Sequence, residues 1–207
     1  MGVSSSPTPS PRRIGTTDSQ SRARLLDAAE ALLLEEGYAS VTSRRVAARA
    51  GLKPQLVHYY FRTMDDLYLD VFRRRAEANL ARIEQAVAED PSLGALWRLN
   101  ADPGGAVFTT EFVALANHHK AIRAEIARYA ERYRAAQLDA LAAALRAHGL
   151  ADELPPIVAL LLMTGLTQIM ALERALGVTA GHDTVVDYIE SVVARLESDR
   201  SESSREA

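Results

Sequence analysis

The side chains with the clearest chemical potential lie in a short stretch, residues 42–60. Within it, Arg44 and Lys53 carry positive charge, and Gln55 and His58 carry hydrogen-bonding groups. An Arg guanidinium can form two hydrogen bonds with guanine, and a Gln amide can do the same with adenine. A Lys ammonium group binds phosphate. The residue types in this stretch therefore match the chemistry of nucleic-acid contact.

The charge of the chain is distributed unevenly, which supports this interpretation. The net charge of the 207 residues is −3, but residues 1–75 contain 12 Lys and Arg against 8 Asp and Glu, a net charge of +4. Residues 37–64 contain no acid and five basic residues, namely Arg44, Arg45, Arg49, Lys53 and Arg62. A compact basic segment in an otherwise acidic protein is typical of a phosphate-binding surface. The alternative is an ordinary solvated face.

The spacing of apolar residues places these side chains on short helices. Residues 19–36 carry apolar side chains every three or four positions, which predicts an amphipathic helix that Gly37 ends. A second helix is predicted over about 43–50 with Thr42 as its N-cap, and a third over about 54–61. Two short helices that are joined by a glycine-containing turn and follow a first helix form a helix-turn-helix motif.

The third of these helices is predicted to have one inward and one outward face. Val57 and Phe61 are four positions apart and face the other helices. This leaves on the outer face Pro54, Gln55, His58 and Tyr59. The N-terminal end of such a recognition helix enters the major groove of DNA. A three-helix packing unit without a DNA role is the alternative, and the acid-free basic stretch favours DNA binding.

Six short motifs run through this part of the chain: Arg22-Ala23-Arg24-Leu25-Leu26, Gly37-Tyr38, Thr42-Ser43-Arg44-Arg45-Val46-Ala47, Ala50-Gly51-Leu52, Val57-His58-Tyr59-Tyr60-Phe61 and Asp65-Asp66-Leu67. Together, residues 21–72 resemble the DNA-binding domain of the TetR family of bacterial transcription regulators. The resemblance covers about a quarter of the chain. It implies an all-α fold, in which an N-terminal helix-turn-helix domain of three helices is joined by a long fourth helix to a C-terminal helical domain for ligand binding and dimerisation.

The resemblance also implies a role for each matched position. Base contacts fall on Arg44, Pro54 and Gln55, and His58 faces bases or sugars. Backbone contacts fall on the aromatic pair Tyr59 and Tyr60. Outside the matched positions, Lys53 and Arg62 flank the site and are expected to supply further charge for the backbone. The hydroxyl at the start of the second helix falls on Ser43, and Thr42 is the cap. Three positions depart from the family pattern, which usually has a small hydroxylic residue at Leu56, Tyr at His58 and Lys at Met64.

The rest of the chain is predicted to be helical, without strands. Apolar periodicity places helices at about 64–88, 92–100, 105–117, 119–148, 156–176 and 182–198. The predicted organisation is a disordered tail over 1–18, the DNA-binding domain over 19–65, the ligand-binding and dimerisation domain over 66–198, and a disordered tail over 199–207. The apolar run 157–172 falls short of the ~20 residues that cross a bilayer. It is therefore predicted to be a helix buried on most sides, in a cytoplasmic protein without membrane contact.

The last two helices resemble those that pair two subunits in the family, which implies a homodimer. Their apolar residues exceed what one helix pair in a small domain needs, although the alternative is that all of them serve the core of one chain. These residues are Ile157, Leu160, Leu161, Met163, Ile169, Val185, Val186, Ile189, Val192 and Val193.

The same domain is expected to enclose a pocket for a small organic effector, which would release a repressor from a palindromic DNA operator. The candidate lining residues are Trp97, Phe108, Phe112, Asn117 and Met163, with Tyr129, Met170, His118 and Gln168 as further candidates. The effector is expected to be apolar or amphipathic. No cofactor is predicted.

Two other functional classes are compatible with parts of the sequence. An enzyme or metal site would use Glu111, His118, His119 and Glu125, but only Glu111 and His118 share a helix face, and two ligands do not complete a metal site. No nucleophile elbow or phosphate-binding glycine loop occurs, so no enzymatic activity is predicted. A helical adaptor without DNA binding is the second alternative, and salt-dependent binding to genomic DNA would separate it from a regulator.

Overall fold

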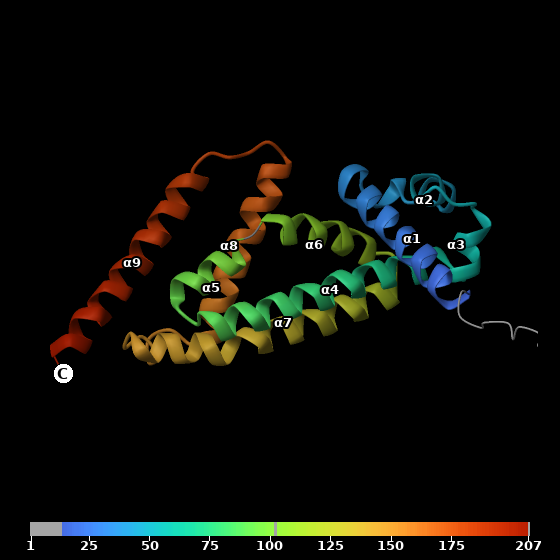
Figure 1. The fold of residues 1–207 in the computed structure, drawn as a ribbon. Coiled ribbons are helices and arrows are strands. Elements are labelled where there is room, and N and C mark those ends of the chain that lie inside the picture. The colour runs from blue at the N-terminus through green and yellow to red at the C-terminus, as the bar shows by residue number, and fades with distance from the viewer. Residues whose placement is uncertain (1–13, 102, 207) are drawn as a thin grey trace, which may run out of the picture. The chain divides into compact units, whose positions relative to one another are not determined.

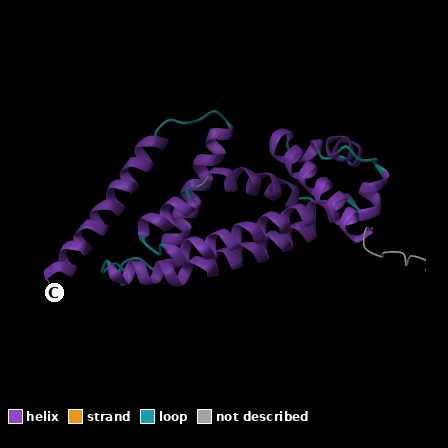
Figure 2. Ribbon diagram, viewed as in Figure 1, coloured by secondary structure: helices purple, strands orange, loops and turns teal. Residues whose placement is uncertain are grey.

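The structure, a computed structural model, describes residues 14–101 and 103–206. All regular structure in these residues is helical and none of them forms a strand (Figure 2), which confirms the all-α prediction. The chain divides into two compact units, Met1–Val71 and Phe72–Ala207, which we call the N-terminal unit and the C-terminal unit. The division falls inside a continuous helix, α4, which spans Met64–Glu89.

The N-terminal unit contains four helical segments before α4 (Figure 1). These are α1 (Ile14–Glu36), a 3₁₀ turn (Tyr38–Ser40), α2 (Ser43–Ala50) and α3 (Gln55–Tyr60). The helix α1 begins before the predicted residue 19, and Asp18 in it accepts a hydrogen bond from Tyr60, which ties the early part of α1 to α3. A disordered tail was expected over residues 1–18. Residues 14–18 are instead part of α1, and residues 1–13 lie outside the described residues.

The core of the N-terminal unit forms where α2 and α3 pack on α1. Val46 and Ala47 on α2 are fully buried, as is Leu25 on α1, and Val57 on α3 is buried almost completely. The small side chain of Ala47 allows α2 to approach α1 closely. The inward face predicted from the apolar spacing is confirmed for Val57 and Phe61, which is 2% exposed.

A glycine fixes the angle between α2 and α3. Gly51 ends α2 in the left-handed conformation with φ 65°, and its N–H donates to the carbonyls of Ala47 and Ala48. Only glycine adopts this conformation without steric cost. A Cβ at Gly51 would also lie 3.1 Å from a guanidinium nitrogen of Arg24, which itself donates to the carbonyl of Ala50. The turn is thus held by backbone geometry and by α1 together.

The C-terminal unit contains the rest of α4 and five further helices. These are α5 (Leu93–Asn100), α6 (Pro103–Ala116), α7 (Lys120–Ala147), α8 (Pro156–Ala175) and α9 (His182–Glu206). Their starts and ends lie close to the predicted ones, except that α9 continues beyond the predicted residue 198. Helices α4 and α7 run side by side (Figure 1) and are joined by ion pairs such as Arg132–Glu77 and Arg73–Glu125.

The main core cluster of the C-terminal unit joins α5, α7 and α8. Leu96, Leu141, Leu145 and Leu160 are at most 2% exposed in it. The side chains of Val193 and Leu196 on α9 pack against this cluster. Glu197 accepts a hydrogen bond of 3.0 Å from the backbone N–H of Gly94 on α5. The side chain of Glu197 thus joins α9 to the start of α5.

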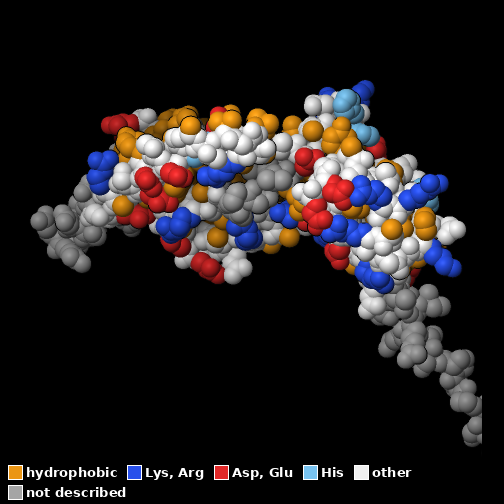
Figure 3. Space-filling view, turned by 90° about the horizontal axis from the view of Figure 1, so that it is seen from above, with side chains coloured by type: hydrophobic (Ala, Val, Ile, Leu, Met, Phe, Trp, Pro, Cys, Tyr) orange, Lys and Arg blue, Asp and Glu red, His pale blue; other side chains and the backbone are white. Residues whose placement is uncertain are grey.

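The helix α8 is far more exposed than predicted. Only 17% of its most apolar stretch is buried, and Leu162 and Ile169 are 63% and 54% exposed. Figure 3 shows hydrophobic side chains at the surface of this unit. The prediction of a helix buried on most sides was wrong, because hydropathy does not separate a core helix from one whose apolar face is left uncovered by its own chain. Among the described residues α8 alone is long and apolar enough to cross a membrane, which for a single helix is weak evidence of a span.

Candidate nucleic-acid interface

Local hydrogen bonds set the positions of α2 and α3. Thr42 caps α2, and its hydroxyl oxygen accepts the backbone N–H of Arg45 at 3.4 Å. Thr63 and Asp66 exchange side chain to backbone hydrogen bonds of 3.1 Å at the start of α4, which is a capping box. The hydroxyl of Tyr68 donates to the carbonyl of Val41 at 3.1 Å, and its burial raises the pKa of this phenol. The segment that carries the candidate residues is thereby fixed at both ends.

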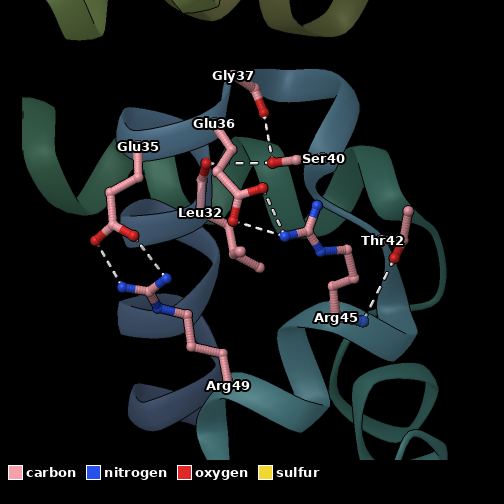
Figure 4. Close-up of polar contacts among 8 residues, drawn as sticks. All are labelled: Leu32, Glu35, Glu36, Gly37, Ser40, Thr42, Arg45 and Arg49. Atoms are coloured by element: carbon pink, nitrogen blue, oxygen red, sulfur yellow. Dashed lines mark hydrogen bonds and ion pairs between the residues drawn. The ribbon is translucent and has the colours of Figure 1, made fainter.

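Two of the five basic residues of this segment are turned away from the outer face. Arg45 forms hydrogen bonds of 2.6 Å with both carboxylate oxygens of Glu36, and Arg49 pairs with Glu35 at 2.6 and 2.7 Å (Figure 4). The hydrogen bond from Glu35 raises the pKa of Arg49. The acid-free stretch is therefore less basic in the fold than in the sequence, because α1 supplies two carboxylates.

Arg44 and Lys53 lie at the surface of the N-terminal unit. Both are exposed, and in residues 14–101 and 103–206 neither has an acidic partner. Arg62 lies 3.9 Å from Asp66, a weak pairing of exposed groups. On the visible face of the N-terminal unit, Lys and Arg stand beside Asp and Glu (Figure 3). The uncompensated charge is thus local, at the beginning of α2 and just before α3.

The outer face of α3 carries the hydrogen-bonding groups that were predicted there. Gln55 and His58 are exposed, and Tyr59 is 70% exposed. Pro54 is the N-cap and already has helical backbone angles. The ring of Tyr59 meets that of Tyr60 edge to face, with centroids 5.0 Å apart. The structure therefore brings Arg44, Lys53 and the start of α3 together on one unit, with their polar atoms available to a ligand.

Two of the predicted residues are less available. The hydroxyl of Tyr60 donates to Asp18, and this hydrogen bond raises the pKa of Tyr60. A phenol has one donor proton, so a phosphate contact through the Tyr60 hydroxyl requires this bond to break. Ser43 is half-buried at the first position of α2. The capping oxygen of Thr42 is an acceptor in the helix, and its O–H remains free to donate.

A cavity of about 440 Å³ lies within the C-terminal unit, between α4, α5, α6, α7 and α8. Of the five main candidates for ligand contact, only Phe108 lines it, and Tyr129 and Gln168 of the further candidates do so as well. Trp97 and Phe112 are buried in the core instead, Met163 packs against the main core cluster, and Asn117 is exposed after α6.

Most of the lining was not predicted from the sequence. Arg75, Asn79 and Arg82 line the cavity from one face of α4. Their spacing of four and three positions is a polar stripe at helical period, and this signal was available in the sequence. Two lining residues take part in a network of hydrogen bonds, in which Tyr133 donates to Asn100 at 2.6 Å and Asn100 donates to the buried Gln137 at 2.8 Å.

The candidate residues for a metal or catalytic site have other roles or lie apart. Glu125 is buried and accepts hydrogen bonds from Arg73 at 2.9 Å and from Arg128. His118 is exposed, and His119 is the N-cap residue of α7. Among the described residues no group of three or more His, Asp or Glu side chains is placed to hold a metal ion.

Comparison with known proteins places the N-terminal unit in a family. Residues 25–71 match the family described as bacterial regulatory proteins, tetR family. An uncharacterised HTH-type transcriptional regulator of Mycobacterium tuberculosis H37Rv is 33% identical over 100 residues, which cover 40% of this chain and 47% of the relative. A regulator of Mycobacterium bovis matches equally well. The match spans about half the length of these relatives.

Solved structures with the same fold cover most of the chain. A TetR transcription regulator from Haloarcula marismortui is 21% identical, with a TM-score of 0.67, over 86% of this chain and 98% of the other. A transcriptional regulator from Saccharomonospora viridis, solved in complex with choline, is 22% identical with the same TM-score, over 83% and 96%. The helix-turn-helix geometry agrees with the match of residues 25–71 to the tetR family of bacterial regulatory proteins, and the solved structures share the fold of most of the chain.

Proposed function

We propose that this protein is a transcriptional repressor that binds a palindromic DNA operator as a homodimer and is released by a small organic effector. The observation that carries the proposal is that two exposed cations, Arg44 at the beginning of α2 and Lys53 just before α3, have no acidic partner among the described residues, on the unit that also exposes the start of α3. Arg44 and Gln55 read base edges in the major groove, and Lys53 and Tyr59 hold the phosphate backbone. The caps at Thr42 and Thr63 fix the starts of α2 and α4, and so help to hold these groups in position.

The homodimer follows from the small size of the reading element and from the surface of α8. The six residues of α3 reach few base pairs, so one DNA-binding unit has modest affinity and two are needed on an inverted repeat. The exposed apolar side chains of α8, including Leu161, Leu162 and Ile169, supply the surface that a second copy would cover. The same contact would remove these side chains from water.

The effector would act through α4. This helix begins in the N-terminal unit and continues into the C-terminal unit, where Arg75, Asn79 and Arg82 line the cavity. A ligand in the cavity changes DNA affinity only by binding one conformation of the dimer better than the other. Couplings of this kind amount to about 1–3 kcal/mol. A regulator of this kind acts in the cytoplasm and needs no catalytic step.

Selection of DNA from a random pool tests the proposal. The full chain should enrich an inverted repeat whose half-sites lie about one or one and a half helical turns apart, at ~34–36 Å per turn. Affinity for the repeat should fall steeply between 50 and 200 mM salt, as counterion release requires. Failure to enrich any sequence, with weak binding at both salt concentrations, would support an adaptor instead.

Substitutions at the two cations separate base reading from charge. Lys53→Ala should weaken all DNA sequences alike, whereas Arg44→Ala should also relax the preference at one base pair. The matched control is Arg98→Ala, which removes an exposed arginine from α5 of the C-terminal unit. Equal loss of affinity in all three variants would mean that only net charge matters, and the assigned roles would be wrong.

A further inference from the structure

One face of the early part of α1 is turned toward the end of α3. Asp18, Ser21 and Arg22 lie three and four positions apart, so their side chains share this face. Asp18 accepts a hydrogen bond from the hydroxyl of Tyr60, to which Ser21 is also hydrogen-bonded. The guanidinium of Arg22 lies 5.4 Å from the centre of the Phe61 ring. The position of Asp18 is therefore set by the packing of α1 against the end of α3.

Arg22 also ties this part of α1 to α4. Its guanidinium forms an ion pair with Asp70. Phe61, which lies under the same guanidinium, is 2% exposed and belongs to the core of the N-terminal unit. Asp18 is itself exposed, but it stands on a helix face that is held in place by these contacts. The hydrogen bond between Tyr60 and Asp18 is thus part of the folded unit.

The Tyr60 hydroxyl lies beside the surface that the proposed function assigns to DNA. Tyr60 is half-buried and follows Tyr59, which is 70% exposed. The two rings meet edge to face with their centroids 5.0 Å apart. A phosphate strand that contacts Tyr59 would therefore pass close to Tyr60, and a phenol O–H can donate to a phosphate oxygen.

We infer that Asp18 lowers the affinity of this surface for the DNA backbone by holding the hydroxyl proton of Tyr60. Asp18 acts through Tyr60, so it is a positioning residue and need not touch DNA itself. The inference rests on the proposed function, because it requires α3 to face DNA. A phenol has one proton, so the carboxylate of Asp18 and a phosphate compete for it.

The exchange of Asp18 for a phosphate returns little free energy. A hydrogen bond from a phenol to a carboxylate is charge-assisted and stronger than one between neutral groups. This bond raises the pKa of Tyr60, so the phenol keeps its proton in neutral solution. A phosphate that takes the proton gains a bond of the same kind, and it leaves the carboxylate beside a second negative charge. Tyr60 therefore adds less to DNA binding than its position allows.

Two other roles for Asp18 would give different results. If Asp18 only repelled phosphates by its charge, its removal would strengthen DNA binding whether or not residue 60 has a hydroxyl. If Asp18 only held α1 in place, its removal would loosen the N-terminal unit and weaken binding. A double-mutant cycle separates the three roles, because it measures the coupling between two side chains.

The cycle uses the full chain and a mixed-sequence DNA duplex of about three helical turns, at about 50 mM salt. Asp18→Ala should bind the duplex about three- to tenfold more tightly than the unmodified chain, which corresponds to one hydrogen bond. In the Tyr60→Phe background, the same substitution should lose most of this gain. Asp139→Ala, which removes an exposed carboxylate from α7, is the control for net charge and should bind like the unmodified chain.

An equal gain in the two backgrounds, no gain, or a loss of affinity in Asp18→Ala would overturn the inference. Asp18→Asn keeps the shape of the side chain and one oxygen acceptor, so it should give a smaller gain of the same sign. If thermal unfolding shows that Asp18→Ala loosens the N-terminal unit, Asp18→Asn in the two backgrounds decides between the outcomes.

The same measurements distinguish this inference from the proposed function. Absence of duplex binding by the unmodified chain would overturn both. Binding by the unmodified chain, with additive effects of the substitutions at Asp18 and Tyr60, would overturn the inference alone. Tighter binding by Asp18→Ala that depends on the Tyr60 hydroxyl would support both.

Discussion

The two regions that the proposed function needs are built in opposite ways. The DNA-facing surface comes from one contiguous stretch, residues 42–60, whose caps and turns are set by near neighbours such as Thr42 and Gly51. The cavity comes from side chains spread between Phe72 and Gln168 on five helices. A site of the first kind follows from local sequence, whereas a site of the second kind depends on how distant helices pack.

The two regions also treat positive charge differently. In the N-terminal unit, α1 neutralises Arg45 and Arg49 through Glu36 and Glu35, and Arg44 next in sequence stays unpaired. In the C-terminal unit, three arginines from two different helices, Arg75, Arg82 and Arg134, line the cavity. Counting charges along the chain predicts neither arrangement, because the acid that pairs with a given arginine lies on another helix.

The largest expected effect would come from separating the two DNA-binding units of a dimer. Ile169→Glu places a charge on the exposed apolar face of α8, where the side chain is 54% exposed and contributes little to the fold of one chain. The dimer should become a monomer, and operator affinity should fall on the order of 100-fold or more because the second unit no longer adds to binding. Ultracentrifugation and operator titration measure the two results.

Two further variants complete this test. Ile189→Glu on α9 should behave like Ile169→Glu, and Ala143→Glu, an exposed position on α7, is the control that should remain dimeric. A monomeric variant that keeps its full operator affinity would show that the α8 surface is not needed for DNA binding, and the proposed dimer would fail.

The neighbouring arginines of α2 offer the sharpest test within the DNA-facing surface. Arg44→Ala should cost about 1–3 kcal/mol of operator binding and relax specificity at one base pair. Arg45→Ala should change DNA affinity far less, because its guanidinium is held by Glu36 at 2.6 Å. Titrations against the operator and its single-base variants measure both. Similar losses in the two variants would show that the pairing seen with Glu36 does not persist on DNA.

The sequence predicted the N-terminal unit well because its signals are local. The cap at Thr42, the turn at Gly51 and the inward side of Val57 were all expected and are all present. The same local signals gave the helix boundaries of the C-terminal unit. The roles of individual residues toward DNA remain predictions.

The sequence did not predict the features that depend on packing between distant helices, namely the lining of the cavity and the exposure of α8. Large aromatic side chains predict a ligand site at Trp97 and Phe112, but such residues fill the core as readily as they line a cavity, and both are buried in the core. The arginines of the lining were missed because charged residues on a helix usually face solvent. The exposure of α8 was missed because its composition matches that of a core helix.

Substitution of Gln137, a buried polar residue behind the cavity wall, tests how strongly the hydrogen bonds of this residue stabilise the C-terminal unit. Gln137 is fully buried, accepts a hydrogen bond from Asn100 and donates to the carbonyl of Tyr133, which lines the cavity. Gln137→Leu leaves these partners without their bonds and should lower the free energy of unfolding by about 1–3 kcal/mol. Urea denaturation measures the change. The control is Gln85→Leu, at an exposed position on α4, and an equal effect in both variants would contradict a structural role for the network.

The smallest expected effect is a pH dependence that belongs to the C-terminal unit. Glu125 is 10% exposed, so burial pushes its pKa up, but hydrogen bonds from Arg73 and Arg128 outweigh this and hold the pKa below the ordinary value of 4.5. Because the folded protein binds this proton less readily than the unfolded chain, the contribution of Glu125 to stability is complete above about pH 4.5. It is lost as the pH falls toward the lowered pKa.

Unfolding in urea between pH 7 and pH 3.5 should therefore show stability falling at the acid end, and the fall should be shallower in Glu125→Gln, which has no carboxylate to protonate. Glu153→Gln, an exposed position between α7 and α8, is the control and should follow the unmodified chain. Operator binding at neutral pH should change little in Glu125→Gln if the effect is confined to the C-terminal unit. Parallel pH profiles for Glu125→Gln and the unmodified chain would show that the two arginines do not hold this carboxylate in its charged form.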